Sequence, residues 1–155
     1  MSIDKCLGKI DKVFDRVKEK CLTFGSHHRK KQLSDRTIKT YRDVVKAYAN
    51  YLYREHGISD LARAKPRYAY DYIDNQIKKY QVNDPNVSAY TMRRFAHALH
   101  SFHEASKVTG VYKGKVKVGD KRVILKKITD AGIYRRSVDS KALKANHSDY
   151  EKVQC

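Results

Sequence analysis

Residues 34–53, SDRTIKTYRDVVKAYANYLY, decide the fold because they encode a long amphipathic helix with a capped start. Ser34 is a suitable N-cap, since its hydroxyl can accept a hydrogen bond from an amide of the first turn. Leu33 and Ile38 can pack together across the cap as a hydrophobic staple. At about 100° per residue, the apolar and polar side chains separate onto opposite sides of the helix. The predicted core face comprises Ile38, Tyr41, Val45, Tyr48, Ala49 and Leu52, and the predicted outer face comprises Arg36, Lys39, Asp43, Lys46, Asn50 and Arg54.

Residues 88–107, SAYTMRRFAHALHSFHEASK, repeat this design. Ser88 takes the cap position, and Val87 with Met92 forms the staple. The outer face carries no carboxylate before Glu104, whereas an ordinary solvated helix mixes charges of both signs. It therefore suits an anionic surface, with a chance run of cations as the alternative. The predicted core stripe comprises Met92, Phe95, Ala96, Leu99, Phe102 and His103, and the predicted outer face comprises Tyr90, Arg93, Arg94, His97, His100 and Ser101.

Together the two segments resemble the first and last helices of the core-binding, SAM-like domain of phage integrases, the tyrosine site-specific recombinases. The resemblance covers about residues 34–107. It implies a small all-helical domain that closes over one face of a DNA duplex, with these two helices nearest the major groove. His100 stands where the family often has arginine. The resemblance rests on Ser34, Thr37, Ile38 and Tyr41 in the first segment and on Ser88, Thr91, Met92, Arg94, Ala98, Leu99, Ser101 and Phe102 in the second.

The charge of the whole chain points to an anionic partner. Its 155 residues include 34 lysines and arginines against 17 aspartates and glutamates, a formal net charge of +17. Nucleic acid fits this charge better than a membrane does, because no apolar run approaches the roughly 20 residues that span a bilayer. The N-terminus lacks a secretory hydrophobic region, and Cys6, Cys21 and Cys155 do not form a disulfide framework. We therefore expect a cytoplasmic protein.

The remaining helices are predicted from periodicity. Apolar residues recur at alternating spacings of four and three over residues 3–24, which predicts a first helix. Pro66 suits the first position of a third helix that runs to about Tyr80. Residues 1–107 would then form a four-helix DNA-binding domain. The basic loop before Leu33 includes Arg29 and Lys30, which could contact phosphates at a helix start or could belong to a solvated linker.

From Val111 onward the apolar period changes to two, which predicts a basic β-hairpin within residues 108–128. Gly119 and Asp120 would form its turn, so that residues 112–118 pair with residues 121–127. Residues 129–155 would form a linker toward an absent catalytic domain, with a short terminal helix near residues 147–153. One face of the hairpin would either contact phosphates or remain solvated. The basic residues of this face are Lys113, Lys115, Lys117 and Arg122.

No residue set for strand cleavage is apparent in the sequence. The family resemblance implies that cleavage needs a tyrosine nucleophile with arginines, a lysine and histidines, all in a separate C-terminal domain. Tyr134 and Tyr150 are not accompanied by such a set, so we expect that this chain is not an enzyme. The resemblance implies a tyrosine recombinase as the parent protein. The chain would be either an N-terminal part of that enzyme or a truncated descendant of one.

Three histidines raise the question of a metal site. His97, His100 and His103 follow one another at a spacing of three, which turns each by about 60° from the previous one around a helix. All three therefore cannot converge on one zinc ion, and no second cluster of ligands with cysteine spacing exists. We expect no metal and no other cofactor.

Together these observations predict a mainly α-helical protein that binds double-stranded DNA. We expect it to act as the core-binding domain of a mobile-element integrase, in DNA integration and site-specific recombination. Other recombinase protomers are expected beside it on DNA. The alternatives are an RNA-binding or ribosome-associated basic protein, and a protein-interaction module whose charge is incidental. The predicted DNA-binding residues are Arg29, Lys30, Arg36, Lys39, Thr40, Lys46, Tyr90, Arg93, Arg94, His97, Lys113, Lys115, Lys117 and Arg122.

Overall fold

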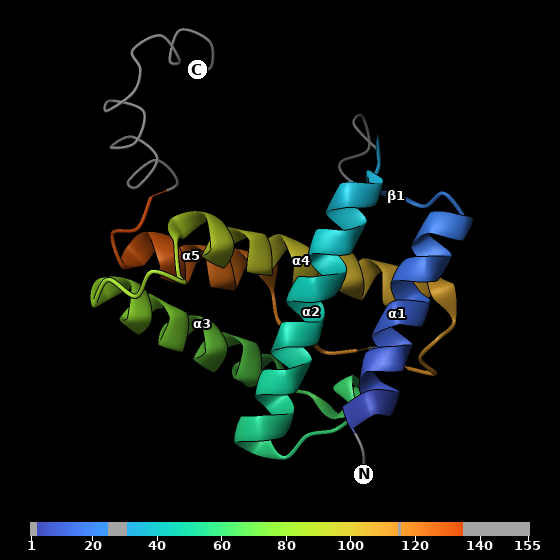
Figure 1. Cartoon of the computed structure of the whole chain (residues 1–155), viewed down its shortest axis with the longest axis horizontal. Coiled ribbons are helices and arrows are strands. Elements are labelled where there is room, and N and C mark those ends of the chain that lie inside the picture. Colours follow the sequence, from blue (N-terminus) through green and yellow to red (C-terminus); the bar gives the residue numbers. More distant parts are fainter. Residues whose placement is uncertain (1–2, 25–30, 115, 135–155) are drawn as a thin grey trace, which may run out of the picture.

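The computed structural model describes residues 3–24, 31–114 and 116–134, which form a helical bundle (Figure 1). A short antiparallel sheet and a 3-10 turn connect the helices. The mainly α-helical fold expected from the sequence is confirmed. The elements in chain order are α1 (Ile3–Glu19), β1 (Thr23–Phe24), β2 (Lys31–Gln32), α2 (Asp35–His56), η1 (Leu61–Arg63), α3 (Pro66–Gln81), α4 (Ala89–Thr109) and α5 (Lys121–Asp130).

The predicted caps of α2 and α4 are present. The Ser34 hydroxyl accepts a hydrogen bond of 3.1 Å from the amide three residues further on. Ser88 and Thr91 form a reciprocal capping box, in which each side-chain oxygen accepts from the other residue's amide, at 3.1 and 2.9 Å. Both helices end at a glycine with positive φ, Gly57 at 67° and Gly110 at 73°. Because capping is a local effect, the sequence was sufficient to locate both helices.

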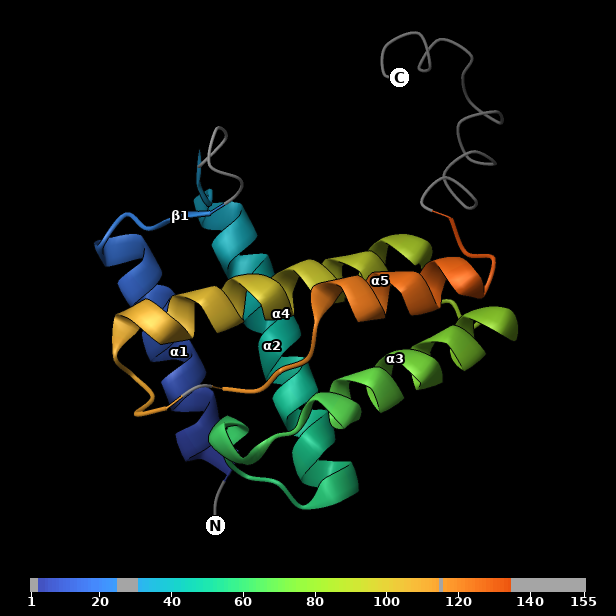
Figure 2. The same cartoon turned by 180° about the vertical axis from the view of Figure 1, so that it is seen from behind.

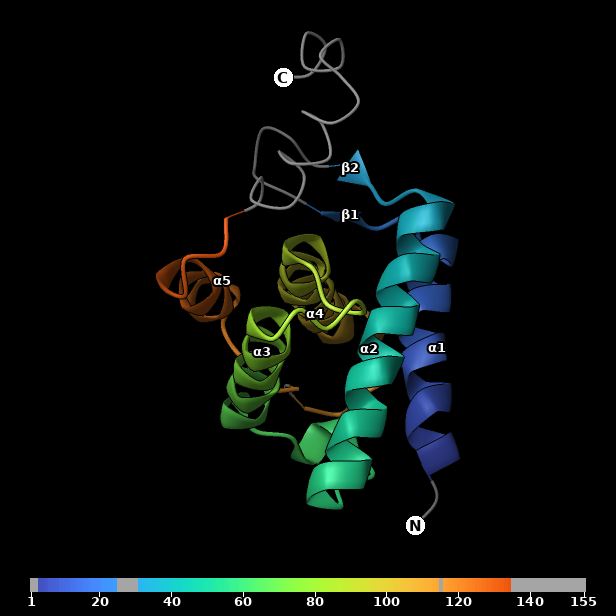
Figure 3. The same cartoon turned by 60° about the vertical axis from the view of Figure 1, so that its left-hand side comes forward.

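Helix α4 lies at the centre of the bundle. Helices α1 and α2 run side by side along one flank of α4, whereas α5 lies along the opposite flank and α3 lies beneath (Figures 2 and 3). A helix packed on several sides buries more than one stripe of side chains. Ser101, which was predicted to face outward, is accordingly buried, with 7% of its surface exposed.

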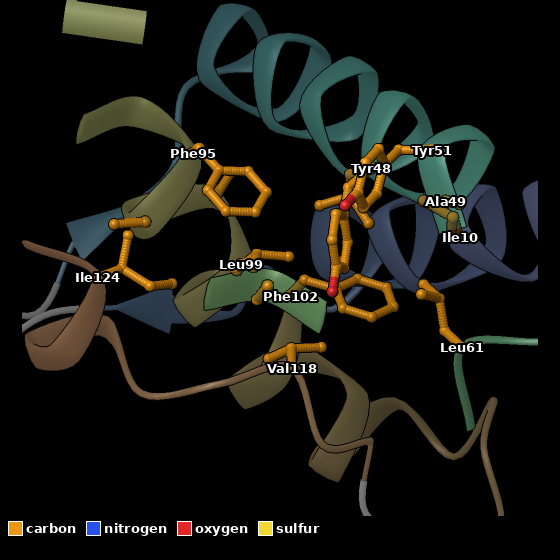
Figure 4. Close-up of a cluster of buried hydrophobic side chains, with 14 of the residues drawn as sticks. Ile10, Tyr48, Ala49, Tyr51, Leu61, Phe95, Leu99, Phe102, Val118 and Ile124 are labelled. Atoms are coloured by element: carbon orange, nitrogen blue, oxygen red, sulfur yellow. The ribbon is translucent and has the colours of Figure 1, made fainter. Parts of the chain in front are cut away.

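The predicted apolar faces of α2 and α4 form the core together with buried residues of α1, α3 and α5. Tyr48 is fully buried, and its ring centroid lies 5.3 Å from that of Phe95 and 5.4 Å from that of Tyr72 (Figure 4). Such edge-on contacts between aromatic rings add to the stabilisation gained by burial. Of the twelve positions predicted as core on these two helices, Tyr41 and His103 are only half-buried, and the others are buried.

The prediction of a hairpin at residues 112–127 is wrong, because the residues predicted as its second strand belong to the helix α5. Asp120, assigned to the hairpin turn, instead caps α5 by accepting a 2.8 Å hydrogen bond from the amide of Arg122. Ile124 and Ile128, four residues apart, are fully buried where α5 packs on α3 and α4. A short apolar run fits either period, and here the surface offered by two other helices favours the helix.

The structure contains a short antiparallel strand pair, β1 and β2, but this pair lies between α1 and α2 rather than after the bundle, and Thr23 pairs with Gln32 in it. The connection from α4 to α5 is irregular and passes below α4 in Figure 2. Because α5 packs on the bundle, the helical body extends beyond the boundary predicted at residue 107. Residues 135–155, which include most of the predicted linker and its terminal helix, lie outside the described residues.

Candidate nucleic-acid interface

The first halves of α2 and α4 border a surface hollow of about 400 Å³, which we call the α2–α4 groove. Both helices begin here, since Arg36 and Tyr90 are the second residues of α2 and α4. The positive ends of two helix dipoles therefore lie beside the groove. Its lining comprises Arg36, Thr37, Thr40 and Tyr41 from α2, Tyr90, Arg93, Arg94 and His97 from α4, and Leu125 from α5.

The groove has the electrostatic character of an anion-binding surface. Three arginines and a histidine line it, and no carboxylate is among the lining residues that the structure describes. Burial is the main cause that raises the pKa of Tyr41 above its ordinary value. The neighbouring Tyr90 raises this pKa further, and Arg94 partly opposes the shift. The Tyr41 hydroxyl therefore keeps its proton near neutral pH. It can donate a hydrogen bond to an acceptor in the groove.

Arg94 is held against the ring of Tyr90. The guanidinium carbon lies 4.9 Å from the ring centroid, within the range of a cation–π contact. The Nε atom of Arg94 is buried and has no hydrogen-bond partner among the described residues. Tyr90 itself remains 55% exposed. The pair thus presents a planar cation on an exposed aromatic platform at the start of α4.

Arg93 is held by the segment that follows α5 rather than by a neighbour on α4. Its Nη2 group donates a 3.0 Å hydrogen bond to the main-chain carbonyl of Ile133, which follows α5. The side chain is half-buried, so this contact fixes it close to the helix surface. Arg93 and Arg94 are therefore restrained by different neighbours, although they are adjacent in the sequence.

Except for Leu125, the residues that line the groove lie in the part of the chain that a known family describes. Residues 28–110 match the phage integrase, N-terminal SAM-like domain. The chain belongs to this family. The matched SAM-like domain, which is the non-catalytic N-terminal part of phage integrases, includes α2, α3 and α4, whereas α1 and α5 lie outside the match. Searches of curated proteins and of solved structures gave no significant match.

Six predicted DNA-binding residues of the SAM-like domain meet in the groove. They come from two helices whose first turns are separated by more than fifty residues of sequence. This juxtaposition could not be read from either helix alone. The six residues are Arg36, Thr40, Tyr90, Arg93, Arg94 and His97.

Two predicted residues of α2 do not line the groove. Lys39 is exposed and lies 3.4 Å from the Asp43 carboxylate, one turn away. Lys46 turns toward α1, where its Nζ lies 2.7 Å from the Asp11 carboxylate. Arg42 contacts the same carboxylate at 3.0 Å, which makes this side of α2 a contact between helices. Lys46 is therefore placed for packing against α1 rather than for the groove.

The lysines predicted on the hairpin are not brought together as a ribbon face. Lys113 and Lys117 are exposed in the irregular connection after α4, and neither is among the residues that line the groove. Arg122 is exposed on α5 and lies 3.3 Å from the Asp120 carboxylate. The remaining predicted residues, Arg29, Lys30 and Lys115, lie outside the described residues.

Three lining residues were not predicted as site residues. Thr37 was used only as part of the family resemblance, and Tyr41 was assigned to the core. Leu125 lies within the predicted second strand, residues 121–127, and it reaches the groove only because residues 121–130 are helical. The spacing of four between Ile124 and Ile128, together with an aspartate before it, was the available signal for that helix.

Other classes of site find no support in the described part of the chain. None of the helices in that part is long and apolar enough to cross a membrane. Nor do the described residues contain a group of three potential metal ligands. His103, one of the three regularly spaced histidines, contacts the Val116 carbonyl through Nδ1 at 2.9 Å. Burial and the nearby Lys121 lower the pKa of His100, so this imidazole is neutral near pH 7.

Proposed function

We propose that this chain binds double-stranded DNA through the α2–α4 groove, as the core-binding domain of a tyrosine recombinase in DNA integration and site-specific recombination. The observation that carries the proposal is the meeting of Arg36, Arg93 and Arg94 in one groove whose described lining holds no carboxylate. The family match supports the same function, because the matched domain belongs to phage integrases.

The two helices that border the α2–α4 groove have dimensions and chemistry suited to the major groove of a duplex. An α-helix with side chains is about 10–12 Å across, and the major groove of B-DNA is about 12 Å wide, so the start of a helix can enter it. Arg93 and Arg94 are the residues proposed to reach guanine edges, since guanidinium groups match the two acceptors of guanine. Arg36 and the exposed Lys39 are proposed to hold phosphates, which set position rather than sequence.

A binding titration tests this function. A labelled random-sequence duplex is titrated with the chain by fluorescence anisotropy at several salt concentrations. If 6 to 10 phosphates are engaged, affinity should fall by about 10³- to 10⁵-fold between 50 and 200 mM salt. An almost flat salt dependence would contradict the proposal. The starts of α2 and α4 should not enter the deep and narrow major groove of A-form RNA, so structured RNA should compete poorly. Structured RNA that competes as well as the duplex would therefore favour RNA binding instead.

A matched pair of variants tests the location. The double variant Arg93→Ala with Arg94→Ala should weaken duplex binding at least tenfold, because it removes two cations from the groove. Arg63→Ala with Lys65→Ala removes the same charge from exposed positions in η1 and directly before α3, which are not among the residues that line the groove. This control should bind within about twofold of wild type at equal salt. Equal losses in both double variants would show that only total charge matters.

The proposal assigns recognition, not strand cleavage, to this chain. The matched domain is the non-catalytic part of phage integrases, so cleavage is assigned to a separate domain. Other recombinase protomers on the same DNA are the proposed protein partners. Incubation of the chain with supercoiled plasmid should leave the plasmid uncut. Reproducible nicking by purified chain, lost on substitution of Tyr134, would overturn this division.

A further inference from the structure

The hydrogen bond from Arg93 to Ile133 joins the groove to a segment that the family match does not include. The match ends at residue 110, whereas α5 and the turn after it lie further along the chain. Figure 2 shows α5 alongside α4, with the end of α5 close to the start of α4. The turn at the C-terminal end of α5 is thus close enough to accept a hydrogen bond from Arg93 and to restrain its side chain.

The turn has a defined geometry that fixes the Ile133 carbonyl. Gly132 adopts φ of 79°, and its amide donates to the Thr129 carbonyl at 2.9 Å. The Ile133 amide donates to the Ile128 carbonyl at 3.2 Å, which completes a Schellman motif. The Ile133 side chain is buried, with 2% of its surface exposed. A glycine in the left-handed region and an anchored apolar side chain together define where the next carbonyl points.

Helix α5 is itself held firmly against the bundle. Ile124 and Ile128 are fully buried, and Lys127 forms an ion pair of 3.2 Å with Asp74 of α3. The acceptor for Arg93 is therefore carried by a packed element. The bond uses one N–H of the Arg93 Nη2 group and leaves the second N–H of Nη2, together with Nη1, for the two acceptors of a guanine edge. A side chain restrained in this way loses less conformational freedom when it binds a base.

We infer that Gly132 and Ile133 are positioning residues that orient Arg93 for recognition of a guanine edge, so that α5 is part of the DNA-reading interface. The inference rests on the proposed function. It adds a specificity role for a segment outside the matched SAM-like domain. Arg94, by contrast, is oriented by Tyr90 within α4 and should not depend on the turn.

The test uses the full chain and a defined probe. The probe is the duplex that wild-type chain enriches from a random-sequence pool, and the readout is its affinity relative to the unselected pool. Gly132→Val places a β-branched residue at positive φ and should reduce this ratio about tenfold, as expected for loss of one bidentate base contact. The salt slope should stay unchanged, because no phosphate contact is removed. A merely structural defect would lower both affinities alike.

Two further variants separate positioning from general damage. Gly57→Val introduces the same strain at φ of 67°, at the end of α2 far from the groove, and should leave the ratio unchanged. In an Arg93→Ala background, Gly132→Val should cause no further loss of the ratio, because the group that it misplaces is already absent. Gly132→Asn should restore the wild-type ratio, since asparagine tolerates the left-handed region.

Each outcome decides the inference. It is overturned if Gly132→Val keeps the wild-type ratio, or if the loss persists in the Arg93→Ala background. Should Gly132→Val fail to fold, Gly132→Ala replaces it, with a smaller loss expected in the same direction. Duplex binding that depends on Arg93 but not on Gly132 removes this inference alone. A wild-type chain that binds no duplex removes the proposed function together with it.

Discussion

Removal of the Tyr48 hydroxyl should stabilise the protein. The side chain is fully buried in the core, and its Oη has no hydrogen-bond partner among the described residues. Burial raises the pKa of Tyr48 far above its ordinary value, which reflects the same lack of compensation for a polar group. An unpaired buried hydroxyl costs about 1–3 kcal/mol of free energy, whereas a paired one contributes a net gain. Tyr48→Phe would remove this cost.

The expected gain follows from two opposing terms. Tyr48→Phe keeps the ring and its contacts with Phe95 and Tyr72, so the packing contribution is retained. The void left by one oxygen costs a few tenths of a kcal/mol, at about 24 cal/mol for each Å³. The net expectation is a free energy of unfolding that is higher by about 1 kcal/mol, or an increase of about 3 °C in Tm.

Urea unfolding followed by circular dichroism measures this change. Tyr51→Phe is the matched control, because the Tyr51 hydroxyl lies 3.5 Å from the Asn75 side-chain amide and so has a partner. The control should be neutral or slightly destabilised. Destabilisation of Tyr48→Phe by more than about 0.5 kcal/mol would refute the reasoning, because it would mean that the hydroxyl is satisfied.

Three further predictions concern the groove, the helix contact and α5. Arg94→Lys keeps the charge but loses the planar group on Tyr90, so anisotropy should show about tenfold weaker duplex binding with an unchanged salt slope; a wild-type affinity would contradict this. Although partial burial opposes the shift, hydrogen bonds from Lys46 and Arg42 lower the pKa of Asp11, so its stabilising effect is present above its ordinary pKa and is lost as pH falls through the lowered value. Asp11→Asn should accordingly lower the free energy of unfolding at pH 7, and the difference from wild type should shrink as pH falls through the lowered pKa; a difference in urea melts that stays constant with pH would argue against it. Ile124→Ala removes a fully buried side chain and should cost about 3 kcal/mol by urea unfolding, whereas a strand-like, exposed Ile124 would cost almost nothing.

The features that the sequence predicted correctly are those determined within a few residues. Ser34 and Ser88 were recognised as caps because a cap and its amide partners are neighbours in the chain. The apolar stripes of α2 and α4 were recognised for the same reason, since periodicity is a local property. The structure confirmed both helices and most of their buried positions.

The features that were predicted wrongly depend on contacts between distant segments. Residues 121–127 were predicted as a strand because so short a run of alternating apolar and polar residues fits a strand as well as a helix. Only packing on α3 and α4 makes Ile124 and Ile128 one buried pair. Lys46 was placed on the outer face of its helix, but the sequence could not show that Asp11 of α1 lies against that face. Ser101 was placed outward because the central position of α4 is a property of the whole bundle.

The groove itself was only partly predictable. The cationic residues on each helix could be listed from the sequence, yet their meeting depends on how α2 and α4 pack. The contact of Arg93 with Ile133 was not foreseeable, because it required both α5 and its C-terminal turn. Sequence patterns therefore supplied candidates, and tertiary structure selected among them.

The most direct test of the proposed DNA-binding surface is a ¹⁵N–¹H spectrum of the chain recorded during titration with duplex DNA. The account predicts that the largest shift changes fall on the amides of residues 36–41 and 90–97, at the starts of α2 and α4. Changes centred instead on Lys113 and Lys117, or on the outer face of α1, would contradict it.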